Sequence, residues 1–104
     1  MNYMEMNNEI LTQYRRLINT INESPDHVVN QIIQNYEPIG DSTLFKELQF
    51  EKRNMNNDML SIFDRTITIS NEIDKAISEC REHGDVEGLR MIISEIVRHY
   101  YVEL

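Results

Sequence analysis

The feature that most constrains the fold is a seven-residue repeat that runs from Phe45 to Cys80. Nine of its eleven positions carry apolar or small side chains, and the exceptions are Lys52 and Thr66. Steps of three and four residues are typical of a coiled coil, whose seam can be buried only against another helix. The sequence therefore predicts an all-α protein. The repeat occupies positions 45, 48, 52, 55, 59, 62, 66, 69, 73, 76 and 80.

One continuous helix over about 42–83 would place the whole repeat on a single face. The weakest part is Thr66 to Ser70, where four consecutive β-branched residues precede a residue that can cap a new helix. Since the three-four spacing passes through this segment unchanged, we expect the helix to continue, with a break there as the alternative.

Shorter helices are predicted on both sides of the long one. Residues 3–21 repeat apolar side chains on one helical face, and Ser24-Pro25-Asp26 has the composition of a second helix start. Gly84 is placed to end the long helix, so that residues from 86 onward fold back on it as an antiparallel αα-hairpin. We therefore expect a four-helix arrangement in a single domain over 1–104.

The first half of the long helix has no assigned partner within the chain. The C-terminal helix can cover only residues from about 62 to 80, and a homodimer is the simplest way to bury the rest. Aromatic side chains near the C-terminus are also suited to an interface, as are Tyr3, Met4 and Met6 near the N-terminus. The predicted surface for self-association or a partner comprises Phe45, Leu48, Lys52, Met55, Met59, Tyr100 and Tyr101.

The charge balance limits the class of partner. The formal net charge is −8, and it is spread along the chain. The negative electrostatic field of such a chain repels nucleic acid unless the basic residues gather on one face. The only adjacent basic pairs are Arg15-Arg16 and Lys52-Arg53, which form a candidate anion-binding set. Nucleic acid is therefore disfavoured, and a protein partner is favoured.

Cysteine content and hydropathy indicate the compartment. Cys80 is the single cysteine, so no internal disulfide can form, and its heptad position predicts a buried thiol in a reducing environment. The first nine residues lack the composition of a secretory signal, and no apolar run is long enough for a bilayer. We expect a cytoplasmic protein with no membrane association. The abundance of Asn and Ile over Lys suggests an AT-rich genome, such as that of a phage or mobile element.

No constellation of residues indicates catalysis or a cofactor. Glu79 and His83 stand four apart, as do Glu95 and His99, but a hairpin would hold the two pairs too far apart for one metal ion. Ser24, Ser42 and Ser70 are all explained as helix caps, and His27 has no nucleophile beside it. We expect no enzyme activity, no metal and no cofactor.

No family resemblance is carried by these residues. The favoured interpretation is a non-enzymatic protein-binding regulator, inhibitor or assembly factor that acts through helix-face contacts, as a homodimer. One alternative is a dimeric nucleic-acid-binding regulator that uses the four basic residues. A second alternative is a structural subunit of a larger assembly.

Overall fold

The computed structural model describes residues 2–100, and every regular element in that range is helical. The predicted all-α class is therefore confirmed. This part of the chain contains five α-helices and two short 3-10 segments. They are α1 (Tyr3–Glu23), α2 (Asp26–Gln34), η1 (Ile39–Asp41), α3 (Thr43–Phe50), η2 (Glu51–Asn54), α4 (Asn57–His83) and α5 (Val86–Tyr100).

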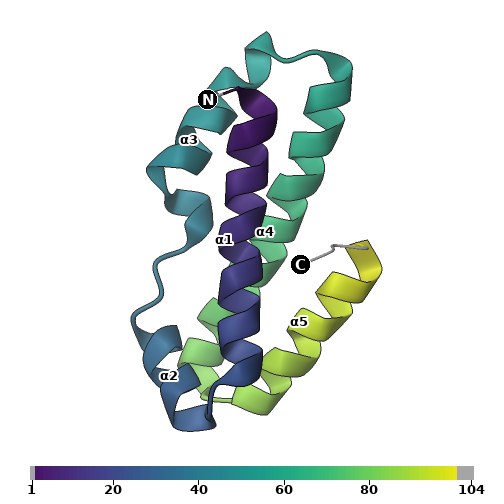
Figure 1. Ribbon diagram of the computed structural model, residues 1–104. Coiled ribbons are helices and arrows are strands. Elements are labelled where there is room, and N and C mark those ends of the chain that lie inside the picture. The colour runs from purple at the N-terminus through teal and green to yellow at the C-terminus, as the bar shows by residue number, and fades with distance from the viewer. Residues whose placement is uncertain (1, 101–104) are drawn as a thin grey trace.

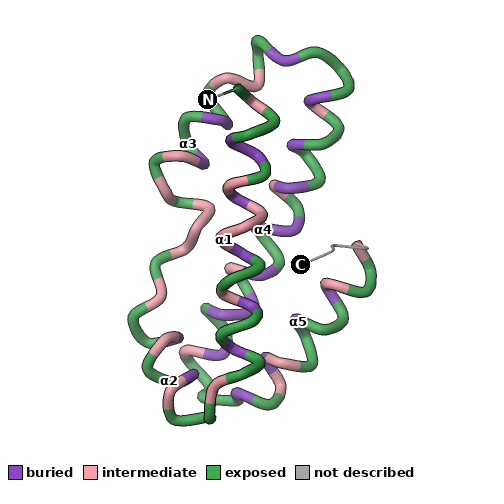
Figure 2. The backbone as a smooth tube through the Cα atoms, in the orientation of Figure 1, coloured by how far each residue is buried: buried purple, intermediate pink, exposed green. Residues whose placement is uncertain are grey.

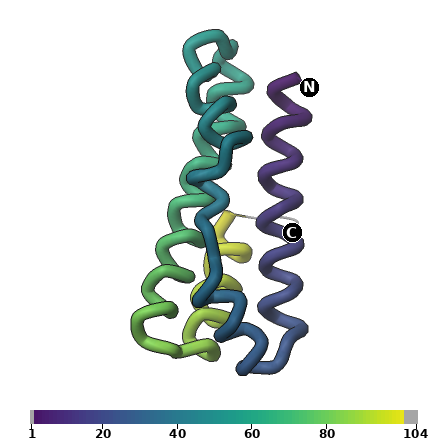
Figure 3. Tube along the Cα trace, turned by 90° about the vertical axis from the view of Figure 1, so that its left-hand side faces the viewer, coloured from purple at the N-terminus to yellow at the C-terminus, as the bar shows by residue number. Residues whose placement is uncertain are grey.

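The two longest helices, α1 and α4, run side by side in the same direction along the long axis of the molecule (Figures 1 and 3). Because they are parallel, the chain must return between them, and α2, η1, α3 and η2 make that return path. The last helix, α5, then turns back beside the second half of α4. The described part measures 43 × 25 × 19 Å along its principal axes.

Local sequence explains where α1 begins and which face it buries. The side chain of Asn2 accepts a hydrogen bond from the backbone N–H of Glu5 at 2.8 Å, which caps the first turn. Apolar side chains then recur every three or four residues and form one buried stripe. The stripe consists of Met6, Ile10, Tyr14, Ile18 and Ile21.

The prediction of one continuous helix over 42–83 is wrong. α3 ends at Phe50, η2 follows, and Met55 is extended with φ −88° and ψ 147°. Asn56 then starts α4 by accepting a hydrogen bond from the N–H of Met59 at 2.8 Å. Asn side chains compete for backbone hydrogen bonds and favour caps over helix interiors, which explains a break in this Asn-rich segment.

The Thr66 to Ser70 segment, the alternative place for a break, lies inside α4. The Thr66 hydroxyl donates to the carbonyl of Ile62 at 3.3 Å, and the Thr68 hydroxyl donates to that of Asp64 at 3.0 Å. Both hydroxyls are therefore satisfied by the preceding helical turn, and the β-branched residues continue the helix.

The seven-residue repeat is buried although it is divided between α3, Met55 and α4. Nine of its eleven residues are buried in the single chain. The rings of Phe45 in α3 and Phe63 in α4 approach to 5.7 Å between centroids. Figure 2 shows buried positions recurring along α1 and α4. The spacing survives the break because the segments on both sides turn the same face to one core.

The connection from α4 to α5 is short. Gly84 adopts φ +69°, a left-handed conformation that favours glycine, and its N–H donates to the Cys80 carbonyl. The carboxylate of Asp85 accepts a hydrogen bond from the N–H of Gly88 at 2.8 Å and so caps α5. Val86, Leu89 and Ile93 are buried, so this end of α5 is attached firmly to the rest of the chain.

Candidate functional site

The predicted partner surface in the first half of the repeat is not exposed. Phe45, Leu48, Met55 and Met59 are each at most 9% exposed and belong to the core of the single chain. The expectation that they lie open for a partner is therefore corrected. The physical reason is that α3 is a separate short helix, which packs its apolar face against α1 and meets α4 through the Phe45–Phe63 ring pair, instead of extending α4 into solvent.

The other predicted surface residues lie at separate places. Lys52 is half-buried in η2 and forms an ion pair with Asp64 at 2.9 Å. Tyr100 is half-buried at the end of α5 and donates a hydrogen bond to Glu72 of α4 at 3.2 Å. Tyr101 lies outside the described residues.

The structure does not bring the four candidate anion-binding residues together. Lys52 and Arg53 lie in η2. A hydrogen bond of 3.2 Å from the Tyr3 hydroxyl to Glu51 places η2 next to the start of α1. Arg15 and Arg16 lie about 18 Å further along α1. Two separate basic pairs on a chain of net charge −8 do not make the continuous basic surface that nucleic acid requires.

A polar cluster centred on Asp74 fastens α4 to the return path and to α1. The hydroxyl of Tyr14 donates to Asp74 Oδ1 at 2.9 Å, the hydroxyl of Tyr36 donates to the same oxygen, and the N–H of Gly40 donates to Oδ2 at 3.1 Å. The Ser70 hydroxyl lies within hydrogen-bond distance of Tyr14 and Asp74. Both carboxylate oxygens are therefore used internally.

Burial keeps the two tyrosines of the Asp74 cluster in their neutral form. Desolvation raises the pKa of Tyr14 and of Tyr36 well above the ordinary value, and the nearby Asp74 carboxylate raises both further. Each phenol therefore stays protonated and donates. A Cβ added to Gly40 would meet Asp74 Oδ2 at 2.8 Å, which shows how closely the backbone approaches this cluster. We interpret the role of the cluster as structural, because its hydrogen bonds join α1 and the return path to α4.

The lone thiol is also structural. Cys80 is buried, as predicted, and its Sγ lies 3.2 Å from the backbone carbonyl of Asp85. Burial, followed by the nearby Asp85 carboxylate, raises the pKa of the Cys80 thiol. A raised pKa reduces the thiolate fraction and therefore disfavours nucleophilic chemistry at this sulfur.

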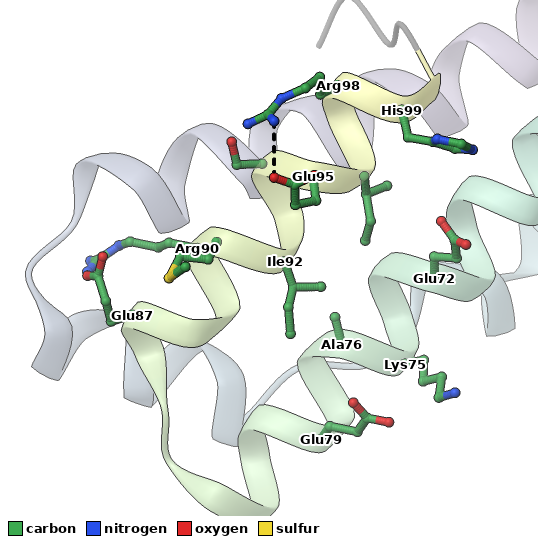
Figure 4. Close-up of a pocket in the computed structure, with 13 residues that line it drawn as sticks. Glu72, Lys75, Ala76, Glu79, Glu87, Arg90, Ile92, Glu95, Arg98 and His99 are labelled. Atoms are coloured by element: carbon green, nitrogen blue, oxygen red, sulfur yellow. Dashed lines mark ion pairs between the residues drawn. The ribbon is translucent and has the colours of Figure 1, made fainter.

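The best candidate site is an open groove between α4 and α5, with a volume of about 920 Å³. In Figure 4, Ile92 of α5 and Ala76 of α4 point toward each other across this groove. Ile96 adds apolar surface at the same floor. Charged side chains of both signs stand around it, namely Glu72, Lys75, Glu79, Glu87, Arg90, Glu95 and Arg98.

Two neighbouring apolar side chains are exposed at this site. Met91 is 64% exposed and Ile92 is 46% exposed, although both belong to a helix that buries Leu89 and Ile93 completely. The core face of α5 was predictable from its spacing, and Met91 lies off that face in the sequence pattern. An apolar residue on the polar side of an amphipathic helix was therefore the signal for this surface, and sequence reasoning did not use it.

Arg90 holds the first half of α5, which forms one wall of the groove, against the rest of the chain. The Arg90 guanidinium donates to the carbonyls of Ile21 at 3.2 Å and Ser24 at 2.8 Å, and it pairs with Asp26 at 2.7 Å. These contacts attach α5 to the turn between α1 and α2. By contrast, Arg98 contacts only its helical neighbour Glu95, at 3.2 Å, among the described residues.

Comparison with known proteins gives no assignment: no family model, curated protein or solved structure matches this chain. Within residues 2–100, no helix is both long and apolar enough to cross a bilayer. The same part of the chain contains no group of three or more His, Cys, Asp or Glu side chains placed to hold a metal ion.

Proposed function

We propose that this chain is a non-enzymatic protein-binding module that acts as a regulator, inhibitor or assembly factor by holding a helical segment against α5 and the α4–α5 groove. The observation that carries the proposal is the pair of exposed side chains, Met91 and Ile92, at the edge of a groove with an apolar floor. Exposed apolar surface with a polar rim is typical of protein interaction sites.

The shape and chemistry of the groove fit a helix better than a small molecule. A helical ligand presents apolar residues at intervals of three and four, and these can lie along a groove formed by two helices. The groove is open along one side, whereas pockets for small ligands enclose most of their ligand. Both acidic and basic side chains line it, so an amphipathic helix with charges of both signs would match its rim.

A peptide selection tests this proposal directly. Helical peptides displayed on phage are selected on the immobilised protein and then measured against the variants Ile92→Lys and Phe50→Lys. Ile92→Lys places a charge at the groove, whereas Phe50→Lys places the same charge at an exposed apolar position in α3. We expect binders whose affinity falls at least about tenfold with Ile92→Lys and is unchanged with Phe50→Lys.

Two outcomes of that selection contradict the proposal. The first is that no helical peptide is enriched over an unrelated helical protein used as bait. The second is that the enriched peptides bind both variants as tightly as they bind the unchanged chain. In either case α5 and its groove with α4 are not the binding element.

A further inference from the structure

We propose that one occupant of the α5 surface is the α5 helix of a second copy, which pairs with it in antiparallel orientation. This inference rests on the proposed function, because it uses the same exposed helix. It names a partner for the outward face of α5, the side that points away from the core. The juxtaposition that supports it is a stripe of four residues on that face: Glu87, Met91, Ser94 and Arg98.

The four residues form one stripe because of their spacing. Steps of four, three and four residues keep them within about 60° of one another around the helix axis. The buried residues Leu89, Ile93 and Ile96 lie on the opposite side of α5. The stripe is therefore the part of α5 that faces furthest from the core, and its central apolar residue, Met91, is 64% exposed.

The charges of the stripe are complementary to those of a second stripe that runs in the opposite direction. Glu87 and Arg98 are equally far from the midpoint between residues 92 and 93, and Met91 and Ser94 share that midpoint. A two-fold axis at this point places Glu87 of each copy opposite Arg98 of the other. The two resulting Glu–Arg pairs lie about 16 Å apart along the helix axis. A parallel arrangement would instead oppose like charges, which is unfavourable.

Apolar contact would form at the centre of the same arrangement. Met91 of each copy lies next to Ser94 of the other, close to the two-fold axis. Ile92, 46% exposed, lies about 100° around the helix axis from Met91, on the side of the groove, and is not part of this seam. The intermolecular seam would thus have an apolar centre and a charge pair at each end.

The ends of the stripe are free to make these pairs. Arg98 and Glu95 are 72% and 68% exposed in their mutual contact, and Glu87 is 77% exposed in its 3.7 Å contact with Arg90. Exposed ion pairs between helical neighbours are weak and easily exchanged. Arg90, by contrast, is held by the turn between α1 and α2 and takes no part in the proposed seam.

The size of the seam sets the expected strength. One helical face of this length buries less than a standard protein interface, and two chains of charge −8 repel each other at long range. We therefore expect a reversible dimer with a dissociation constant in the micromolar range. Sedimentation equilibrium from about 1 µM to about 500 µM brackets such a constant.

Charge exchange separates the proposed seam from general repulsion. Glu87→Arg changes the net charge from −8 to −6, which would strengthen association if general repulsion decided it. The proposed pairing predicts the opposite, because the introduced guanidinium would face Arg98 of the other copy. We expect Glu87→Arg and Arg98→Glu each to raise the dissociation constant at least about tenfold.

Mixing the two charge variants supplies the rescue. In a mixed pair the two arginines at positions 87 and 98 of one chain face the two glutamates at positions 98 and 87 of the other, so the mixture should dimerise about as tightly as the unchanged protein. The double variant Glu87→Arg/Arg98→Glu should do the same with itself. Misfolded chains could not be rescued in this way, and circular dichroism of each variant checks its helix content.

Each result has a defined meaning. A chain that stays monomeric at every concentration overturns the second-copy proposal, while selected peptides can still bind the groove and support the proposed function. A dimer that is insensitive to both charge variants also overturns it, because another surface must then form the interface. Peptides that fail while the charge exchange succeeds would leave a dimer without the wider binding function.

Discussion

The two sides of α4 between residues 70 and 79 differ in how completely their polar groups are used. On one side, Asp74 accepts hydrogen bonds from Tyr14, Tyr36 and the Gly40 backbone. On the other side, Lys75 and Glu79 line the groove and form no ion pair with any of residues 2–100.

That contrast separates a part of the molecule that is complete within one chain from a part that can still gain contacts. A saturated polar cluster fixes the position of the helices around it, since each group that leaves it must lose a buried hydrogen bond. Charged side chains without an ion pair, beside exposed apolar side chains, can still form ion pairs with a second molecule. Loss of a group from the Asp74 cluster should therefore alter stability, whereas changes on the outward face of α5 should alter association.

The largest effect should come from Asp74→Ala. Tyr14, Tyr36 and the N–H of Gly40 would each lose an acceptor in a largely desolvated place, so we expect the free energy of unfolding to fall by about 3 kcal/mol. Urea denaturation followed by circular dichroism measures the change. The control Asp64→Ala removes an exposed acid from the same helix and should cost about 0.5 kcal/mol or less. Equal losses in the two variants would contradict the special role of Asp74.

A smaller but localised effect should come from Arg90→Met. This change keeps most of the aliphatic volume and removes the bonds to Ile21, Ser24 and Asp26, so we expect a loss of about 2 kcal/mol. Hydrogen exchange should rise more in α5 than in α1. Arg98→Met, whose guanidinium contacts only exposed Glu95 among the described residues, serves as the matched control. Uniform exchange along the whole chain would show that Arg90 does not hold α5 in particular.

Alkaline pH should lower the stability of the folded chain, in part through the tyrosines of the Asp74 cluster. Burial raises the pKa of Tyr14 in the folded chain, whereas in the unfolded chain the phenol ionises near 10. Above about pH 10 the unfolded state therefore binds fewer protons, and stability falls with rising pH by up to about 1.4 kcal/mol per pH unit for each such tyrosine. Denaturation between about pH 9 and 11 should show a shallower slope in Tyr14→Phe. An unchanged slope would mean that Tyr14 is not the titrating group.

The smallest effect on folding should come from Met91→Lys. Its side chain is mostly exposed, so we expect the free energy of unfolding, measured well below micromolar concentration, to change by less than about 0.5 kcal/mol. The same variant should abolish self-association, because it places two lysines at the centre of the seam. Phe50→Lys, at 63% exposure, is the matched control and should leave association unchanged. A stability loss with Met91→Lys comparable to that of Asp74→Ala would place Met91 in the folded core.

Much of the fold could be predicted from the sequence because helices leave local signals. Apolar spacing predicted the helical class and the buried faces of α1 and α5, and Gly84 marked the end of α4. The break at residues 51–56 could also have been found, since Asn56 followed by Asp58 is a favourable helix start. The seven-residue repeat hides this break, because its spacing continues unchanged through a segment that is not one helix.

The candidate site was less predictable for a physical reason. Phe45 and Leu48 are apolar whether their cover comes from the same chain or from another, and only the folded path of α2 and α3 places them inside one chain. The Asp74 cluster joins residues that are 34 to 60 positions apart in sequence. No local pattern links such residues, because their contact depends on how the helices pack.

The sequence by itself determined that this chain is helical, which residues face inward and where most helices begin and end. These properties depend on hydrogen bonds and side-chain spacing within a few residues of one another. Only the tertiary structure decided that the repeat is buried within one chain and that Met91, on the outward face of α5, is left without cover. Burial is a property of the whole arrangement, since a side chain is covered only by elements that folding brings to it from elsewhere in the chain.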